Sequence, residues 1–565
     1  MNYRWTFKEN SNEETVLNLS KTLKIPKTLA KVLVNRGINT ENEAVDFFEP
    51  IPSKIHDPFL MNNMDIAVDR IIESINRKEK IWIHGDYDVD GTTSAAILLH
   101  FFREIGVDAN TYIPDRYQFG HGLSEISINN AITNDSKLLI TVDVGITSID
   151  AVNYSNSKNL DVIICDHHEP AENIPNAYTI LNPILETCNY PFKQLAACGV
   201  VFKLLQALTI KLNIPEKAYE YLDFVALATI ADMVPLIGEN RVFVSEGLKL
   251  INSNPRPGFK GLLHCTRLKI GHINSTNIVF AIAPLINAAG RMGDALRSVE
   301  MMVQKDENSA FTIAQQLEEE NRRRRTFDYQ AFEEATEIAE RQIKEGRRAL
   351  VIHKADWHPG VIGIVAARLV EKFNLPTILM TSIDKIAKGS ARSCNNFDVH
   401  SALKKASHLM LEFGGHRHAA GLSIKEENIS ELREIFENLA KIQIPSDLLT
   451  PEIAIDTELK LNDLSPNFFH ILNSFSPFGY QNSKPVFYSK NVKSANGVKI
   501  VGNNNLKFRA FQNNFVIDAI GYGLANKINI ITSGKPFSIL FNLEMNNFNG
   551  SNHPQLFIKD IKYEN

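Results

Sequence analysis

Three short segments of the chain concentrate carboxylates and imidazoles. The stretch His84-Gly-Asp86-Tyr-Asp88-Val-Asp90 holds one histidine and three aspartates, and Asp143 and Asp166-His167-His168 follow downstream. Aspartate and neutral histidine suit Mn²⁺ or Mg²⁺ better than a soft-ligand metal, and the imidazoles favour Mn²⁺. Together the segments predict one divalent-metal site, and such a site indicates hydrolysis of a phosphate ester.

Each segment closes an apolar run that is typical of a buried parallel strand. The runs are Lys80–His84, Leu138–Val142 and Leu160–Cys165, and helical patterns lie between them at Thr92–Phe102 and Ile146–Tyr154. Alternation of strand and helix predicts a doubly wound α/β sheet, whose ligands gather at the carboxyl edge of the strands. Side chains far apart in the sequence would meet at that edge.

Each motif also has a simpler interpretation. Asp90-Gly-Thr92 is typical of a helix N-cap, Asp143 of a loop after a strand, and a lone His168 of an ordinary surface or core histidine. Helix capping does not require three strand ends all to carry acids or imidazoles. The motifs taken together therefore favour the metal site.

The same residues resemble the signature motifs of the DHH phosphoesterases. The resemblance continues, in the family's order, through Leu227–Leu236, Asn287–Gly293, Asp356–Gly363, Ser390–Ser393 and Gly414–Gly421. The whole set is similar to the bacterial single-strand-specific 5′ exonucleases of that family, with no departure at the expected ligand positions. It implies a DHH domain with a doubly wound parallel sheet, a long helix, a smaller α/β domain of the DHHA1 type and a C-terminal OB-fold β-barrel.

The resemblance also implies a centre of two divalent cations, with Mn²⁺ preferred and Mg²⁺ as the alternative. The expected ligands are His84, Asp88 and Asp143 for one cation, and Asp90, His167 and Asp232 for the other, with Asp143 shared. Asp86 and Asp166 are expected to orient these ligands. His168 would face the scissile phosphate and stabilise its charge or donate a proton.

Removal of nucleotides from a 5′ end requires residues that stop the strand there. We expect Arg116 to bind the terminal 5′ phosphate together with Ser390 and Arg392, because arginine contacts phosphate bidentately. Arg291 and His416 are expected at the scissile or the next phosphate. Pairing of Arg116 with its neighbour Asp115 remains an alternative.

Changes of pattern along the chain predict five segments. Residues 1–75 form short helices, including one at Thr40–Phe48 with an N-cap threonine and a capping-box acid. The other segments are the DHH domain at 76–305, a connecting helix at 306–346, the DHHA1-type substrate domain at 347–446 and the OB-fold domain at 447–565. The connecting helix is expected to be long and solvent-exposed. Its Arg322–Arg325 run could touch DNA, although pairing with Glu318–Glu320 at helical spacing is favoured.

Short strands separated by turn residues predict a small barrel near the C-terminus. The expected strands are Glu452–Asp456, Pro485–Tyr488, Leu506–Phe511, Phe515–Ile520 and Phe537–Phe541. From Lys484 to Lys535 eight Lys or Arg accompany one acid, and aromatic residues from Phe487 to Tyr522 are interleaved with them. Basic charge follows a phosphate backbone while aromatic rings stack on bases, which favours single-strand binding. The expected contacts are Lys493, Lys499, Lys507 and Arg509. For Phe508 and Phe511, packing in the barrel core is expected at least as much as stacking on bases.

Composition agrees with a nucleic-acid enzyme without adding much. The chain of 565 residues has a formal net charge of −5, and two divalent cations would raise this to −1 (−5 + 4). No apolar run reaches the roughly 18 residues of a membrane span, and five cysteines form no CxxC pair. We expect a cytoplasmic monomer without membrane contact that acts on single-stranded DNA in repair and recombination. A single-strand-binding protein and a helicase are the expected partners.

The same metal motifs leave other functions open. They also serve inorganic pyrophosphatases and phosphodiesterases that act on very short RNAs or cyclic dinucleotides. These enzymes need no third domain with a basic, aromatic face, so the chain length of 565 residues favours the exonuclease. A non-catalytic replication scaffold is the remaining alternative, but a scaffold is expected to have lost ligands.

Overall fold

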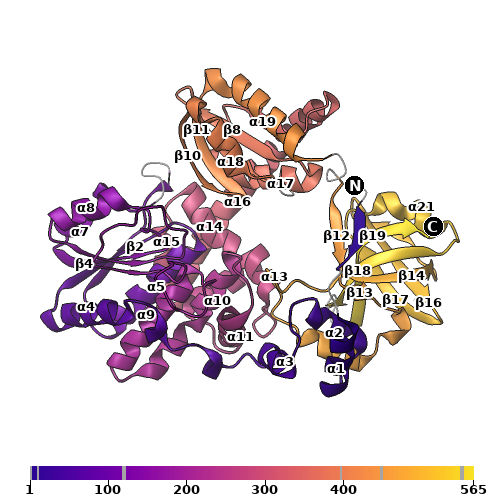
Figure 1. The fold of residues 1–565 in the computed structure, drawn as a ribbon, viewed down its shortest axis with the longest axis horizontal. Coiled ribbons are helices and arrows are strands. Elements are labelled where there is room, and N and C mark those ends of the chain that lie inside the picture. The colour runs from indigo at the N-terminus through magenta and orange to yellow at the C-terminus, as the bar shows by residue number, and fades with distance from the viewer. Residues whose placement is uncertain are drawn as a thin grey trace. The chain divides into compact units, whose positions relative to one another are not determined.

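The computed structural model describes residues 3–8, 12–116, 122–394, 397–445, 450–546 and 553–564. The chain divides into two compact units, whose elements are labelled in Figure 1. The larger unit comprises residues 56–232 and 247–451, and the smaller comprises residues 1–55, 233–246 and 452–565. Among the described residues, no helix has both the length and the apolar character that crossing a membrane requires.

A five-stranded parallel sheet forms the first half of the larger unit. Its order is β3-β2-β4-β5-β6, with all neighbouring pairs parallel. The strands are β2 (Lys80–Gly85), β3 (Ala109–Tyr112), β4 (Ser136–Val142), β5 (Asp161–Cys165) and β6 (Thr179–Leu181). The three predicted strands are confirmed as β2, β4 and β5. The register pairs His84 with Thr141 and Val142 with Cys165, so the motif-bearing ends of these neighbours reach one edge.

Helices cover both faces of this sheet, which confirms the doubly wound α/β fold (Figure 1). The helices on one face are α7 (Glu125–Thr133) and α8 (Ile149–Ser157), and those on the other are α4 (Met64–Arg77), α5 (Val89–Glu104) and α9 (Ala197–Lys211). The remaining helical elements of this half are η2 (Pro58–Leu60), η3 (Pro215–Tyr221), α10 (Leu222–Ala231), the end of α11 (Gly238–Ser253), α12 (Pro257–Thr266), α13 (Ser275–Asn277), the π-helical turn η4 (Ile278–Ile282), α14 (Ala283–Met292) and α15 (Leu296–Met302).

The predicted connecting helix is α16 (Glu307–Lys344), which begins at its N-cap Asp306. The expectation that it is solvent-exposed is wrong for one side of the helix. Small and apolar side chains are buried along that side, at Ala310, Ala314, Leu317, Ala331, Ala335 and Ala339. Small residues let neighbouring helices approach closely, so α12 and α14 pack on the first part of α16 and α17 packs on the last.

The arginine run on α16 pairs only in part as predicted. Arg322 pairs with Glu319 at 2.6 Å, the helical spacing expected. Glu320 instead pairs with Arg297 of α15, and Arg324 donates to the side chain of Asn321.

A second, mixed sheet forms the other half of the larger unit. Its order is β10-β11-β9-β8-β7, in which β7 and β8 are parallel and the other pairs antiparallel. The elements are β7 (Leu350–His353), α17 (Pro359–Phe373), β8 (Thr377–Ile383), β9 (Ile386–Arg392), α18 (Val399–Lys405), η5 (Ser407–Leu409), β10 (Met410–His416), β11 (Ala419–Lys425), η6 (Glu426–Asn428) and α19 (Ile429–Gln443). α16 and α17 share a core with one face of the sheet, and α18 and α19 with the other. The predicted second α/β domain is confirmed.

A β-barrel dominates the smaller unit. The strand order is β13-β14-β18-β19-β17-β16-β15, and pairing of β14 with β16 closes the barrel. The elements are β13 (Thr457–Glu458), η8 (Leu461–Asp463), α20 (Pro466–Asn473), β14 (Phe487–Ser494), β15 (Lys499–Val501), β16 (Asn505–Gln512), β17 (Phe515–Gly521), η9 (Ala525–Lys527), α21 (Ile528–Thr532), β18 (Phe537–Asn546) and β19 (His553–Tyr563). The predicted barrel is confirmed.

One predicted barrel strand lies elsewhere. The segment Glu452–Asp456 forms β12 (Glu452–Ile455), which pairs in parallel with β1 (Arg4–Phe7) in a separate two-stranded sheet. Residues 1–75 therefore contain a strand as well as the helices α1 (Glu13–Thr22), α2 (Lys27–Val34) and α3 (Glu41–Phe48) and the turn η1 (Pro52–Lys54). The start of α3 is as predicted, because Thr40 and Glu43 form the capping box. The boundary predicted at 446/447 lies outside the described residues.

Candidate metal centre

The carboxyl edge of the parallel sheet brings the predicted ligands together. Three groups of ligand-type side chains have their ligand atoms within 4.8 Å of one another: Asp143, His167 and His168; Asp90, His167 and Asp232; and Asp86, Asp88 and Asp143. The second group is one of the two predicted ligand sets. The third group shares Asp88 and Asp143 with the other predicted ligand set. It contains Asp86, which we expected to orient ligands, in place of His84. His84 lies beside this group near the end of β2.

Asp143 owes its position to a tight turn after β4. Its φ is +65°, a left-handed conformation that aspartate tolerates better than most residues. Its amide donates to the carbonyl oxygen of Cys165 at 3.0 Å, which ties the turn to β5. Gly145 has a φ of +120°, and a Cβ there would lie 2.7 Å from Thr141 Oγ1. The sequence Asp-Val-Gly therefore meets a backbone requirement as well as supplying a carboxylate.

Asp88 and Asp90 are held in two different ways. Asp88 is the N-cap of α5, and its Oδ1 accepts from the amides of Asp90 and Gly91. The two oxygens of Asp90 accept from the amides of Ala197 and Cys198 at 2.7 and 2.8 Å. These amides begin α9, where the helix dipole favours a negative charge. The capping interpretation thus holds for Asp88, not for Asp90.

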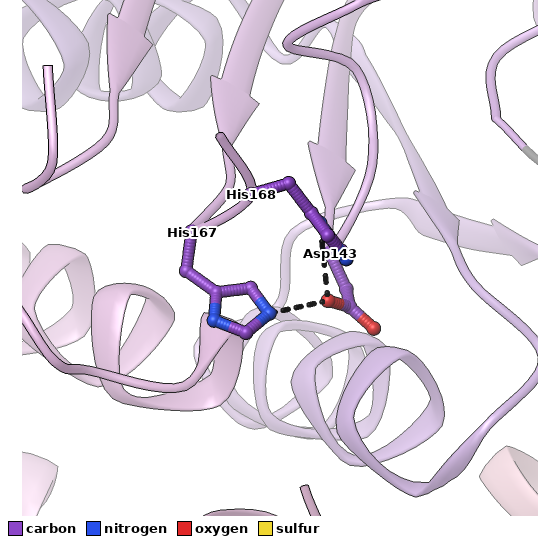
Figure 2. A group of neighbouring side chains, drawn as sticks. All are labelled: Asp143, His167 and His168. Atoms are coloured by element: carbon purple, nitrogen blue, oxygen red, sulfur yellow. Dashed lines mark ion pairs between the residues drawn. The ribbon is translucent and has the colours of Figure 1, made fainter. Parts of the chain in front are cut away.

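His167 points one ring nitrogen into the cluster. Its Nδ1 lies 3.1 Å from the carbonyl oxygen of Leu195, which can only accept a hydrogen bond. Nδ1 therefore carries the proton, and Nε2 presents a lone pair. Nε2 lies 3.3 Å from Asp143 Oδ1 and 3.8 Å from both Asp90 Oδ2 and Asp232 Oδ2. Figure 2 shows His167 and His168 both directed at the same oxygen of Asp143.

Asp166 organises the turn that carries both histidines. It accepts from the amides of Ile146, His167 and His168, and its Oδ1 lies 2.7 Å from His168 Nδ1. Burial would raise the pKa of Asp166, but the bond from His168 and the backbone amides outweigh it, so the pKa is lowered. For His168 burial acts downward, yet the same bond raises its pKa to about 9. Saturated with donors, Asp166 fits the predicted orienting role.

The carboxylates of the cluster are buried close to one another. Burial and then the charge of Asp88 raise the pKa of Asp90 to about 7; burial and then the charges of Asp90 and Asp88 raise that of Asp232 to about 9. Burial, reinforced by the charges of Asp90, Asp88 and Asp86, raises the pKa of Asp143 well above its usual value. Such groups carry charge together only when positive charge is supplied.

His84 supplies a second sign that a cation belongs here. The residue is fully buried, and burial lowers its pKa to about 4, so the ring is neutral. The backbone of Gly122 opposes this shift in part without reaching hydrogen-bond geometry. Within the described residues neither ring nitrogen of His84 has a hydrogen-bond partner. Repelling carboxylates and an unsatisfied imidazole fit a divalent cation.

α14 fixes the segment that carries the aspartates. Asn287 Oδ1 accepts from the amide of Val89 at 3.2 Å. A Cβ at Gly290 would lie 2.6 Å from the carbonyl oxygen of Tyr87, so only glycine allows this approach. Arg291, predicted to bind phosphate, donates to the carbonyl oxygen of Gly360 at the start of α17, at 3.2 Å. Arg291 thus lies where the two halves of the larger unit meet.

Arg116 and Arg392 lie close enough for their charges to interact. Arg392 Nη1 donates to Ser390 Oγ at 2.7 Å. Burial lowers the pKa of Arg392, and the charge of Arg116 lowers it further. Arg116 lies with its guanidinium carbon 4.9 Å from the centre of the Tyr87 ring. Two arginines that disfavour each other's charge would be relieved by a phosphate between them. Residues 117–121, which follow Arg116, lie outside the described residues.

Gly363 of α17 lets this helix lie close to the two β9 residues of the predicted phosphate site. A Cβ there would come within 3.0 Å of Arg392 Nη2 and 3.1 Å of Ser390 Oγ. Any larger residue would displace one of these groups.

Glycines also keep the strand side of this surface open. Ser390 lies opposite Gly421 on β11, which lies opposite Gly414 on β10. Among the described residues, no atom lies within 4 Å of the place that a Cβ would take at either glycine. His416 is exposed two residues beyond Gly414, in the row that crosses β11 to Arg392. Ser390, Arg392 and His416 therefore share one face, as their predicted roles require.

The four predicted basic contacts of the barrel lie at its surface. On β16 the side chains of Leu506, Phe508 and Ala510 are buried, while the alternating residues face outward. The register pairs Lys499 with Lys507 and Lys493 with Phe511, and Arg509 pairs with Asp518 at 3.8 Å. Phe487 and Phe508 fill the core, which confirms the core-packing alternative for Phe508 and leaves neither ring exposed for stacking on a base.

Contributors to the site that had no predicted role include the Leu195 carbonyl, the start of α9 and the Asn287 side chain. The first two act through backbone atoms, which leave no trace in residue type. Asn287 belongs, with Arg291, to the segment Asn287–Gly293 that carries the family resemblance. Its place in that segment was the sequence signal that could have identified it.

Models of three families match consecutive parts of the chain. The DHH family N-terminal domain matches residues 80–229, the DHHA1 domain residues 346–441, and the RecJ OB domain residues 455–560.

Curated relatives and solved structures agree with these matches. The single-stranded-DNA-specific exonuclease RecJ of Bacillus subtilis is 35% identical over 99% of this chain and 70% of its own length. RecJ of Dickeya dadantii is 30% identical over 95% of this chain and 96% of its own. The crystal structure of RecJ from Thermus thermophilus in complex with Mn²⁺ superposes with a TM-score of 0.83 at 26% identity, covering all of this chain and 80% of that one. Its Mg²⁺ complex gives a TM-score of 0.78 at 25% identity, covering all of this chain and 79% of that one.

Proposed function

This chain belongs to the RecJ family of single-stranded-DNA-specific exonucleases, and we propose that it removes nucleotides from the 5′ end of single-stranded DNA and releases 5′-mononucleotides. The observation that carries the proposal is the convergence of Asp90, His167 and Asp232 with Asp143 at one sheet edge. Retention of every predicted ligand argues against a non-catalytic scaffold.

Two divalent cations, with Mn²⁺ preferred over Mg²⁺, would supply the positive charge that the reaction needs and lower the pKa of water. Their proposed ligands are His84, Asp88 and Asp143 for one, and Asp90, His167 and Asp232 for the other, with Asp143 shared. Asp86 and Asp166 would position these ligands. The imidazole of His168, bonded to Asp166 through Nδ1, keeps Nε2 for the scissile phosphate or the leaving oxygen.

The bond that breaks joins phosphorus to the O3′ of the terminal nucleotide. Water supplies the oxygen that joins phosphorus, and O3′ takes up a proton as it leaves. The released nucleotide keeps its own 5′ phosphate, and the next nucleotide acquires one. Arg116, Ser390 and Arg392 would therefore meet the same terminal group after each cut, while Arg291 and His416 hold the scissile or the next phosphate.

The rest of the single strand would run over the barrel surface at Lys493, Lys499, Lys507 and Arg509. We place the protein in the cytoplasm as a monomer, in repair and recombination. A helicase and a single-strand-binding protein would present its substrate.

One assay separates the candidate functions. With Mn²⁺, a single strand labelled at its 5′ end should release labelled mononucleotide at once, whereas a strand labelled at its 3′ end should shorten step by step. Duplex DNA and pyrophosphate should remain intact. Rapid cleavage of dinucleotides without degradation of long strands would instead identify a short-oligonucleotide phosphodiesterase, and turnover of pyrophosphate a pyrophosphatase.

A further inference from the structure

Phe280 projects from the turn that leads into α14. It is 73% exposed, whereas Ile278 and Ile282 in the same turn are fully buried. The turn is therefore anchored while the ring faces solvent. A single exposed apolar residue is ordinary, but a π-helical turn is rare and frequently lies at a functional site. Whether the exposed Phe280 ring has a role in function depends on where it lies relative to the metal centre.

The residues on the open side of this helix lead from Phe280 to the metal centre. Phe280, Pro284, Asn287 and Arg291 follow at spacings of four, three and four residues, which places them on one helical face. Asn287 binds the start of α5, next to Asp88 and Asp90. Phe280 lies eleven residues before Arg291, roughly 16 Å along the axis at about 1.5 Å per residue. In Figure 1, α13 and α14 succeed one another along the side of this domain away from α7 and α8.

The contacts along α14 show in which order a bound strand would pass the phosphate site, the metal centre and Phe280. At one end, Arg291 donates to the carbonyl oxygen of Gly360. About one turn further along α17, a Cβ at Gly363 would come within 3.0 Å of Arg392 and 3.1 Å of Ser390, the proposed site of the terminal phosphate. Asn287 beside the aspartates comes next, and Phe280 stands at the far end. A strand whose 5′ phosphate is held at Arg392 would cross the metal centre before it reaches Phe280.

We propose that Phe280 stacks on a base of the single strand a few nucleotides to the 3′ side of the scissile phosphate. The proposal rests on the exonuclease function proposed above and adds a contact outside the cleavage site. Aromatic stacking accepts every base, as an enzyme that must degrade any sequence requires. It would also make substrate length matter, because a dinucleotide ends before it reaches this ring.

Kinetics on two substrates test the contact. Phe280→Ala should raise KM for a long single strand by roughly 5- to 150-fold, the range for loss of one base stack. Turnover of a 5′-phosphorylated dinucleotide should stay unchanged, and Phe280→Trp should restore the KM for the long strand. The matched control is Ile442→Ala, which removes an 80% exposed side chain from α19. An equal loss on both substrates, or none on either, would overturn the proposal.

A fluorescent base locates the contact directly. 2-Aminopurine, whose fluorescence falls on stacking, is placed at successive positions from the 5′ end and bound to protein inactivated by Asp143→Asn. One position on the 3′ side should be quenched, lose its quenching in Phe280→Ala and keep it in Phe280→Trp. Quenching that ignores the substitution contradicts the stack, as does a change of oligomeric state in Phe280→Ala, which would mark a protein contact. If the unsubstituted protein does not shorten single strands, the proposed function fails. If it does shorten them and Phe280→Ala behaves in the same way, this inference alone fails.

Discussion

His167 Nε2 lies 3.3 Å from Asp143 Oδ1, and both atoms are acceptors. The other ring nitrogen of His167 must hold its proton for the carbonyl of Leu195. Two acceptors at this distance repel unless a proton or a cation lies between them. Burial and the charges of Asp90, Asp88 and Asp86 raise the pKa of Asp143, which favours the neutral carboxyl over the carboxylate when no metal is bound. The geometry is thus set for exchange of a proton for a cation.

Asp143→Asn should separate stability from function. In metal-free protein the amide has the shape of the carboxyl, adds no charge beside the buried Asp90 and can donate to His167 Nε2, so the melting temperature should stay equal or rise. The rise on adding Mn²⁺ should shrink, because a shared ligand is lost; saturation at 100 times Kd is worth about 2.7 kcal/mol. Exonuclease activity should collapse. Thermal unfolding with and without Mn²⁺, beside a turnover assay, measures all three.

The matched control is Asp150→Asn, at an exposed aspartate in the first turn of α8. It should keep both the Mn²⁺-dependent rise and the activity. Near-normal turnover of Asp143→Asn under Mn²⁺ would remove Asp143 from the mechanism.

Arg392 should read the strand end. Arg392→Ala should lose most of the preference for a 5′-phosphorylated over a 5′-hydroxyl strand, since a hydrogen bond to a charged group contributes about 1.5–3 kcal/mol, roughly tenfold or more. Arg392→Lys keeps the charge without the planar fork and should fall between. The ratio of kcat/KM for the two substrates is the measurement. Lys404→Ala, on α18 at the other face of the sheet, is the control. An equal loss on both substrates would mean that Arg392 holds the strand generally.

Much of the metal centre could be predicted because its elements have strong local signals. β2, β4 and β5 are apolar runs, and the parallel arrangement alone fixes that their ends share an edge. The hydrogen bonds that fix the Asp90 carboxylate could not be predicted in this way. Its partners are the amides of Ala197 and Cys198, which any residue other than proline would supply.

The remaining differences between the sequence predictions and the structure arise where a segment packs on residues distant in the sequence. Glu452–Asp456 has the alternation of a strand, but that pattern does not say which strand it joins, and its partner β1 lies at the other end of the chain. The buried side of α16 is carried largely by alanines, which signal no amphipathic helix in a highly charged sequence.

His100 should make the larger unit sensitive to acid. Its Nδ1 lies 2.9 Å from the hydroxyl of Tyr221, which donates to Glu104, and burial and the charge of Arg256 lower its pKa to about 4. The unfolded value is about 6.5. As pH falls from 6.5 towards 4 the unfolded chain takes up a proton that the folded protein refuses, so stability falls, by at most about 3 kcal/mol.

His100→Gln should flatten that dependence. Denaturant unfolding of the larger unit at pH 7 and pH 5 measures it, and the difference between the variant and the unsubstituted protein cancels the contribution of the metal-site carboxylates. His272→Gln, at an exposed histidine before α13, should keep the full dependence. Parallel profiles for His100→Gln and the unsubstituted protein would exclude His100 as its source.

The barrel surface should bind long strands through charge. The four residues reversed to glutamate are Lys493, Lys499, Lys507 and Arg509. Affinity for a long single strand should fall, and the slope of log affinity against log salt should become less steep by about 0.7 for each phosphate that the variant no longer neutralises. Cleavage of a short oligonucleotide, held in the larger unit, should change little.

The control reverses the same number of charges on α1, α2 and the turn between them, at Lys21, Lys24, Lys27 and Lys31. Both proteins then have the same net charge, so an equal loss in the two would indicate only the general field of the protein. Unchanged affinity in the barrel variant, with its melting temperature preserved, would leave this surface without a role in strand binding.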